Sequence, residues 1–330
     1  MKIAFFDVTD EEQALFGSLI SKQELSFSHE SLTRNSITLA KHADVVYVRS
    51  FSQITKDILS NLPRLRFIAT RSTGFDNIDI EACQRRKIVV SNVPHYATVT
   101  VAEHTLGLLL SLTHNIVDSS QQTKNHNIVD SSQQTKKGSF KEGPLSSEIS
   151  NKTLGIVGFG AIGSQVATIA RGFDMRILVY TTHPTSSKAK KYGVTFVDFQ
   201  DLLQKCDAIS FHVPLTQETH HMLNMNNIAL CKRRSILLNT SRGEVIETKS
   251  ILWALDNGVL VAAGLDVLEN ERELKQSNHD CLERRLMKDK RVIVTPHNAY
   301  HSHEALETIL RISAENINAF IRNKPIHRVV

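Results

Sequence analysis

The feature that most constrains the fold of this chain is the glycine-rich segment Gly158-Phe159-Gly160-Ala161-Ile162-Gly163. It follows an apolar run at residues 154–157 and precedes a helix-compatible segment. In a strand-turn-helix unit the first glycine permits a tight turn, the second lets a pyrophosphate approach the backbone, and the third lets helix and strand pack closely. The pattern alone is weak evidence, but in this context it predicts a dinucleotide site lined by residues 158–163, including Ala161 and Ile162.

The residue that would identify the dinucleotide is expected about twenty residues further on, at the end of the second strand. That position reads Tyr180-Thr181-Thr182-His183, and Thr181 stands where an acidic residue would bind the ribose of NAD. Without a carboxylate nothing repels a 2′-phosphate, and the hydroxyls, His183 and Lys188 could bind one. The sequence therefore leaves NAD(H) and NADP(H) open.

Short β-rich runs alternate with helix-compatible stretches through most of the chain, and this alternation predicts parallel sheets built from βαβ units. A first series occupies the N-terminal third, and a second series starts near Thr153 and suffices for a doubly wound sheet. We therefore predict an α/β protein with two Rossmann-like or flavodoxin-like parallel-sheet domains. The expected strands are 3–8, 44–48, 65–69 and 87–90 in the first series, and 154–157, 177–180, 208–213, 236–239, 261–265 and 292–294 in the second.

The domain boundary is expected near Asn92-Val93-Pro94, where the pattern changes. Thr100 and Glu103 have the spacing of a capping box and predict the start of a long buried helix, in which Gly107 would permit close packing. The helical stretch 304–321 has no sheet of its own and should return to the first domain. The predicted domains are a discontinuous substrate domain, 1–98 plus 300–330, and a dinucleotide-binding domain, 99–299.

A tandem duplication follows the long helix, because residues 114–125 recur as 126–137 with Asn125 replaced by Lys137. The repeated unit carries only isoleucine and valine as core-type residues. We expect an exposed helical extension or a surface loop rather than a new packed element.

Composition narrows the class of protein. The 330 residues are 41% hydrophobic and 22% charged, which suits two ordinary domains. No apolar run is long enough for a membrane helix, and the first residues do not resemble a signal peptide, so a cytoplasmic location is expected. The net charge of +5 comes from short clusters without interleaved aromatics, which does not indicate nucleic-acid binding. Four dispersed cysteines suggest neither zinc nor disulfides.

Three segments that follow strands of the second series carry catalytic residue types. A guanidinium such as that of Arg242 can bind the carboxylate of a 2-keto acid in bidentate fashion. The imidazole of His297 can protonate the carbonyl oxygen as hydride reaches carbon, and the Glu271 carboxylate would favour the protonated ring. The segments are Asn239-Thr240-Ser241-Arg242-Gly243, residues 264–271, and Thr295-Pro296-His297-Asn298-Ala299.

With these residues in place, the chain resembles the D-2-hydroxyacid dehydrogenase family over nearly its whole length. Further shared motifs are 73–79, Asn92-Val93-Pro94, Val101-Ala102-Glu103-His104-Thr105 and His212-Val213-Pro214-Leu215-Thr216. The resemblance implies that Arg242 binds substrate, that His297 is the acid and base, and that Glu271 is its partner. It also implies a homodimer joined through the cofactor domain. The implied cofactor contacts, beyond the glycine segment, are Tyr180, Thr181, Val213, Pro214, Thr240, Ser241, Asp266 and His297, with Asp266 at the nicotinamide amide.

Substrate contacts are implied by the same resemblance. Backbone near Ser72, Thr73 and Gly74 would close on the substrate carboxylate across an interdomain cleft. Tyr96 and Tyr300 resemble the aromatic residues that line the pocket in the D-lactate dehydrogenase branch. His301 and His303 lie near His297, but because His297 must carry a proton we expect no metal site.

The substrate implied is a small 2-keto acid and its D-2-hydroxy acid, with pyruvate and D-lactate first. Glyoxylate, hydroxypyruvate and 3-phosphoglycerate are alternatives, although only Arg49 and Arg71 are at hand for a phosphate. A protein of another class also fits the triad, namely an NAD(H)-sensing interaction protein like the corepressors that share this fold. The sequence does not decide the oligomeric state, the origin of the duplication or the physiological direction.

Overall fold

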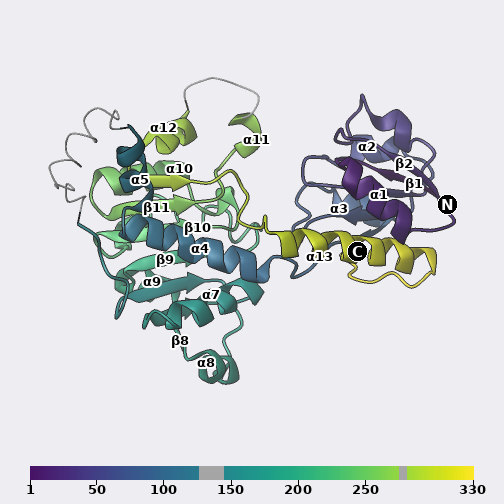
Figure 1. Cartoon of the computed structure of the whole chain (residues 1–330). Coiled ribbons are helices and arrows are strands. Elements are labelled where there is room, and N and C mark those ends of the chain that lie inside the picture. The colour runs from purple at the N-terminus through teal and green to yellow at the C-terminus, as the bar shows by residue number, and fades with distance from the viewer. Residues whose placement is uncertain (126–144, 275–280) are drawn as a thin grey trace. The chain divides into compact units, whose positions relative to one another are not determined.

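The computed structural model describes residues 1–125, 145–274 and 281–330 (Figure 1). These residues divide into two compact units. One consists of Met1–Ala97 with His301–Val330, and the other is Thr98–Tyr300. Each unit contains its own parallel sheet and its own hydrophobic core, which confirms the predicted fold class.

The first unit is built on a five-stranded parallel sheet with the order β2-β1-β3-β4-β5, the flavodoxin-like arrangement. The strand β2 was not predicted, because its short segment is only partly buried and lacks a strong apolar pattern. The strands are β1 (Lys2–Phe5), β2 (Glu24–Phe27), β3 (Val45–Val48), β4 (Phe67–Thr70) and β5 (Val89–Ser91). The helices are α1 (Asp10–Leu19), α2 (Lys56–Ser60), α3 (Ile80–Arg85), α13 (His303–Ile321) and the 3₁₀ turn η1 (Ile37–Ala40).

Helices cover both faces of this first sheet. On one face Ile58 of α2 and Cys83 of α3 belong to the core. On the other face α1 and the C-terminal helix α13 pack together, and the Phe320 ring stacks on the Phe67 ring at 4.5 Å. Ser302 caps α13 by accepting a hydrogen bond from the N–H of Ala305. The last helix is therefore an integral part of the first unit.

The second unit contains a seven-stranded parallel sheet, in the order β12-β11-β10-β9-β6-β7-β8. The chain leaves the middle of the sheet at β6 and builds first to one side and then to the other. The switch point between β6 and β9 is where open α/β sheets bind ligands. The strands are β6 (Thr153–Val157), β7 (Arg176–Tyr180), β8 (Thr195–Phe196), β9 (Ala208–Phe211), β10 (Ser235–Asn239), β11 (Leu260–Leu265) and β12 (Val292–Val294).

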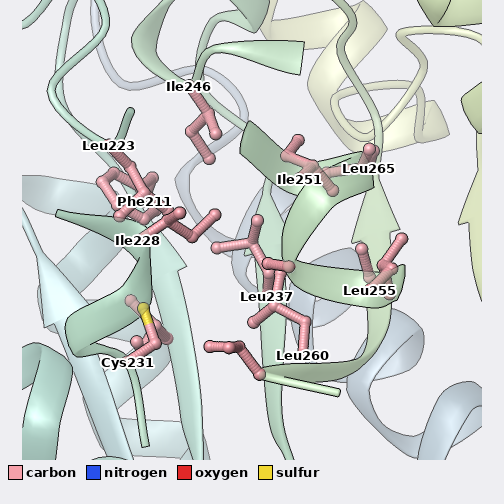
Figure 2. Packing of buried hydrophobic residues seen from close by; sticks show 14 of the residues in the cluster. Phe211, Leu223, Ile228, Cys231, Leu237, Ile246, Ile251, Leu255, Leu260 and Leu265 are labelled. Carbon is pink, nitrogen blue, oxygen red and sulfur yellow. The ribbon is translucent and has the colours of Figure 1, made fainter. Parts of the chain in front are cut away.

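Two helical layers cover this second sheet. The helices α4 and α7 pack on one face, where Leu109 and Val166 are buried together. On the opposite face Phe211, Leu237 and Ile251 belong to a larger hydrophobic cluster, part of which Figure 2 shows. The helices are α4 (Thr98–Thr113), α5 (Ile116–Asn125), α7 (Ala161–Arg171), α8 (Ser186–Tyr192), α9 (Phe199–Lys205), α10 (Thr248–Asp256), α11 (Glu271–Leu274) and α12 (Leu282–Lys288), with 3₁₀ turns η2 (Ile228–Leu230) and η3 (Gly243–Val245).

Two predictions about α4 are wrong. The helix begins at Thr98, so Thr100 lies inside its first turn and is not the cap. A cap stabilises a helix by only about 1 kcal/mol, so the spacing of a capping box does not by itself fix where a helix begins. An added Cβ at Gly107 would meet no atom within 4 Å, so this glycine is not needed for packing within the chain. Close approach instead requires Gly264 on β11, where an added Cβ would lie 3.1 Å from Cβ of Leu108.

The first copy of the duplicated segment forms a separate helix. The helix α4 ends at Thr113, Asn115 adopts a left-handed conformation with φ of 51°, and α5 begins at Ile116. Ile116 is 52% exposed, which agrees with an exposed helical extension. The second copy, residues 126–137, lies outside the described residues. None of the helices that are described is long and apolar enough to cross a membrane.

Candidate active site

The glycine segment forms the turn between β6 and α7. Gly158 has φ of 95°, and an added Cβ would lie 2.6 Å from the carbonyl oxygen of His212. At Gly163 an added Cβ would lie 2.1 Å from the Gly158 carbonyl oxygen, so helix and turn touch through backbone. Gly160, the N-cap of α7, faces open space, since an added Cβ would meet nothing within 4 Å. The first and third glycines are thus sterically required, and the second leaves room for a phosphate beside helix N–H groups.

The expected contacts for the rest of a dinucleotide gather around this turn. The N–H of Gly158 donates to the carbonyl of Tyr180 at 2.9 Å. A Cβ on Gly158 would also lie 2.8 Å from Cγ1 of Val213, and Pro214 follows as an exposed residue. The residues Gly158, Tyr180 and Val213, which come from three adjacent strand ends, therefore meet at the switch point. These residues fit a bound dinucleotide.

Threonines and a histidine occupy the end of β7. The Thr181 hydroxyl accepts a hydrogen bond from the N–H of His183 at 3.4 Å, and the Thr182 hydroxyl lies 2.8 Å from Nδ1 of His183. Thr181 is half-buried and His183 is exposed. Residues 181–192 contain no carboxylate, so the segment that follows β7 carries no acid to oppose a phosphate on the ribose.

Arg242 lies in the turn after β10, and Asn239 holds the backbone of that turn. The side-chain carbonyl of Asn239 accepts from the N–H of Ser241 at 3.0 Å, and its amide donates to the carbonyl of Arg242 at 2.8 Å. The guanidinium of Arg242 donates to the carbonyl of Ser241 at 2.7 Å and is half-buried. The Thr240 hydroxyl is 2.9 Å from that of Thr105 on α4. The turn is therefore fixed on both sides.

Asp266 follows β11 and is 2% exposed. Its Oδ1 accepts from the Thr295 hydroxyl at 2.5 Å and from the N–H of Asn298 at 3.0 Å, and its Oδ2 accepts from the N–H of Ala299 at 2.9 Å. The carboxylate thus binds the Thr295 side chain before His297 and the backbone N–H groups of Asn298 and Ala299 after it. Asp266 fixes the position of the loop that carries the imidazole.

His297 and Glu271 form a hydrogen-bonded pair. Nδ1 of His297 lies 2.9 Å from Oε2 of Glu271, while Oε1 of Glu271 accepts from the N–H of Leu268 at 2.8 Å. The backbone of His297 is left-handed, with φ of 55°, a conformation that is uncommon for residues other than glycine. The side chain is 44% exposed. The carboxylate favours the tautomer with a proton on Nδ1, so Nε2 is the nitrogen that can exchange a proton with a ligand.

Sequence reasoning missed a second histidine-carboxylate pair on the loop that bears Glu271. Glu269 accepts from Nε2 of His221 at 2.5 Å and from the N–H of Thr248 at 2.7 Å. Burial would raise the pKa of Glu269, but these hydrogen bonds outweigh it and lower the pKa below its ordinary value. At Gly243 an added Cβ would lie 2.0 Å from the carbonyl oxygen of Leu268. The turn after β10 and the loop after β11 are therefore packed together, and no sequence spacing indicated it.

The remaining predicted contacts belong to the first unit or to the end of the second. Ser72 donates through its hydroxyl to the carbonyl of Gly74 at 2.6 Å, and the Thr73 hydroxyl donates to the carbonyl of Val93 at 2.8 Å. Within the described residues the N–H groups of Thr73 and Gly74 donate to no protein acceptor, so they suit a carboxylate. Tyr96 and Tyr300 are half-buried and belong to different units.

Comparison with known proteins identifies the family. The family model for the NAD-binding domain of D-isomer-specific 2-hydroxyacid dehydrogenases matches residues 106–299. The chain belongs to this family. Among similar D-2-hydroxyacid dehydrogenases, a glyoxylate reductase of Thermococcus litoralis is 36% identical over 86% of this chain and 82% of its own length. D-lactate dehydrogenase kk1H of Curvularia clavata is 33% identical over 98% of this chain and 94% of its own.

A solved structure of the family agrees with the fold. The D-lactate dehydrogenase of Aquifex aeolicus, complexed with NAD and lactic acid, superposes with a TM-score of 0.87 at 31% identity, and it covers 98% of this chain and 96% of its own. The prediction of an oxidoreductase of the D-2-hydroxyacid dehydrogenase type with an NAD-binding domain is therefore confirmed.

Proposed function

We propose that this chain reduces pyruvate to D-lactate with NADH, and that Arg242, Glu271 and His297 are its active residues. The observation that carries the proposal is the hydrogen bond between His297 Nδ1 and Glu271 Oε2. It leaves Nε2 to face a ligand. The bound nicotinamide supplies the hydride for the carbonyl carbon.

The residues of the chain perform the other tasks in this proposal. The Arg242 guanidinium binds the substrate carboxylate and polarises the carbonyl group. His297 Nε2–H gives its proton to the carbonyl oxygen, so that one hydride and one proton convert the keto acid to the hydroxy acid. Glu271 stabilises the imidazolium before the transfer and holds the ring afterwards, and the partly exposed ring regains its proton from water. Thr73 and Gly74 would add backbone N–H donors to the carboxylate.

A phosphorylated substrate is less well supported. Arg49 and Arg71 of the first unit are the candidates to bind a substrate phosphate, and Arg71 is buried in an ion pair with Glu12. Its side chain is only 6% exposed, so this charge is already compensated inside the protein. Arg49 donates to the carbonyl of Asp7 at 3.4 Å. We therefore favour a small substrate without a phosphate.

Glyoxylate is the second candidate, because glyoxylate reductases are among the similar curated proteins. Tyr96 and Tyr300 are the proposed contacts to the substrate methyl group, which glyoxylate lacks.

NADPH is a second candidate cofactor, since Thr181 offers a hydroxyl where a carboxylate would repel a phosphate. A homodimer through α4 is also proposed, because Val99 is 51% exposed and Gly107 faces open space on this helix.

Initial rates with pyruvate, glyoxylate and hydroxypyruvate, each with NADH and NADPH, test these proposals together. The expected result is the highest kcat/KM with pyruvate and NADH, and a product oxidised by a D-specific but not by an L-specific lactate dehydrogenase. A higher kcat/KM with glyoxylate than with pyruvate would mean that glyoxylate, and not pyruvate, is the substrate. NADH binding without turnover of any keto acid would favour the sensor hypothesis.

A further inference from the structure

The helix α4 contacts the catalytic end of the second sheet through His104, a residue to which neither the mechanism nor the predicted cofactor contacts give a role. Nε2 of His104 lies 3.1 Å from the Thr295 hydroxyl oxygen and 3.8 Å from Oδ1 of Asp266. The imidazole is 25% exposed. His104 thus connects the helix to the loop between β12 and His297.

The directions of these hydrogen bonds follow from chemistry. The Asp266 carboxylate also accepts two backbone N–H groups, and a carboxylate offers only acceptors. The hydroxyl proton of Thr295 must therefore point to Asp266, at 2.5 Å. The hydroxyl oxygen then accepts from His104, so Nε2 of His104 carries hydrogen. The hydrogen bonds therefore all point in one direction, from the His104 N–H through the Thr295 hydroxyl to the Asp266 carboxylate.

The acceptor positions of Asp266 are nearly filled. Oδ1 accepts from Thr295 and Asn298, and Oδ2 accepts from Ala299. A carboxylate has about four acceptor positions, so about one is left, on Oδ2. Its direction depends on the rotation of the carboxylate, and the Thr295 hydroxyl limits that rotation from the Oδ1 side.

We propose that His104, acting through Thr295, is a positioning residue that aims the remaining acceptor of Asp266 at the carboxamide N–H of the nicotinamide. This inference rests on the proposed function, in which Asp266 contacts that amide. Without the N–H of His104, the Thr295 hydroxyl is no longer held toward Oδ1 of Asp266, and only the backbone N–H groups of Asn298 and Ala299 still orient the carboxylate. His104 therefore sets how well the protein distinguishes a nicotinamide carboxamide from other ring substituents.

A purely structural role predicts a different result from the proposed one. If His104 only holds α4 on the sheet, its loss weakens every dinucleotide equally. If it aims Asp266, its loss weakens only those dinucleotides that donate an amide N–H. The analogue 3-acetylpyridine adenine dinucleotide, in which a methyl ketone replaces the carboxamide, separates the two cases.

The experiment is calorimetric titration of the full chain with NAD and with this analogue, without substrate. The variants His104→Leu and Thr295→Val should weaken NAD binding about 5- to 10-fold, which is the change in affinity expected for the loss of one hydrogen bond. Their affinity for the analogue should fall by less than about twofold. His104→Gln, whose amide can donate from nearly the same place, should restore NAD binding. The double variant should bind NAD as tightly as Thr295→Val alone, because both substitutions break the same row of hydrogen bonds.

His114→Gln, at an exposed residue just beyond α4, is the matched control and should bind both ligands like the wild type. Equal losses for NAD and the analogue, or additive losses in the double variant, would overturn the inference. Asp266→Asn tests the underlying assignment separately. If it changes the ratio of the two affinities and His104→Leu does not, only the role of His104 is wrong. If Asp266→Asn leaves the ratio unchanged, the proposed contact of Asp266 fails, and this inference fails with it.

Discussion

Nδ1 of His297 lies 2.9 Å from Oε2 of Glu271, and Asp266 accepts from the backbone N–H groups of Asn298 and Ala299, which follow the same histidine. One carboxylate therefore orients the ring and another orients the peptide. These contacts hold the loop in which His297 has a left-handed φ of 55°. The ring orientation and the backbone position of the proposed proton donor are thus both fixed before a ligand binds.

The first prediction concerns proton transfer. His297→Gln should lower kcat with pyruvate about 10²- to 10⁴-fold, because no group then gives a proton to the carbonyl oxygen. Glu271→Gln should lower it less, since an amide oxygen still accepts the Nδ1 proton but brings no charge. NADH affinity should hardly change. Steady-state rates and NADH titrations check this, with His303→Gln as the control; full activity of His297→Gln would contradict the mechanism.

The second prediction concerns cofactor choice. Thr181→Asp should raise the KM for NADPH by at least about tenfold, because a carboxylate at the end of β7 repels the 2′-phosphate. The KM for NADH should stay the same or fall. Thr181→Asn is the uncharged control of nearly the same size. Similar changes for both cofactors in the aspartate variant would show that residue 181 does not contact the ribose.

The third prediction concerns the packed turn and loop beside Arg242. Gly243→Ala should reduce the free energy of unfolding by about 1–3 kcal/mol and raise the KM for the keto acid, because its Cβ would overlap the Leu268 carbonyl and push Arg242 and Glu271 apart. Chemical denaturation and steady-state kinetics provide the measurements. Gly17→Ala is the control, since a Cβ there meets nothing within 4 Å. Unchanged kinetics in Gly243→Ala would show that the loop tolerates displacement.

The fourth prediction concerns acid stability. Burial lowers the pKa of His212 to about 3, and among the described residues its Nδ1 has no hydrogen-bond partner. An unfolded histidine binds a proton below about pH 6.5, but the folded protein does not until about pH 3. His212 therefore costs stability increasingly as pH falls through this window, by at most about 1.4 kcal/mol per pH unit.

The variant His212→Gln tests this sign, because its amide can still bond with Ser210 as the imidazole does at 2.8 Å. Urea unfolding at several pH values between 7 and 4 should give the wild type the steeper decline in stability. Parallel declines for the two proteins would mean that His212 does not limit acid stability.

The fifth prediction concerns assembly. Gly107→Arg should convert the proposed dimer to a monomer, because the new side chain projects from the exposed side of α4 where the second copy would lie. Sedimentation velocity measures the change. Gly17→Arg, on another exposed helix surface, should leave assembly unchanged. A dimer that survives Gly107→Arg would show that α4 is not at its centre.

Local patterns were sufficient for much of the architecture. Gly158 and Gly163 were predicted to serve a tight turn and close packing, and the structure gives both a steric reason. Buried parallel strands are apolar throughout, so most of them could be found from short hydrophobic runs. The strands β2 and β8 could not, because they are short edge strands with little burial.

The sequence by itself determined which residue types could perform the chemistry, because Arg242, Glu271 and His297 each follow a strand and strand ends meet at one edge of a parallel sheet. Only the tertiary structure decided which groups support them. The contacts of His104 with Thr295 and of Glu269 with His221 join residues 191 and 48 positions apart. Such contacts depend on how helices and loops pack, and local sequence periodicity carries no information about that packing.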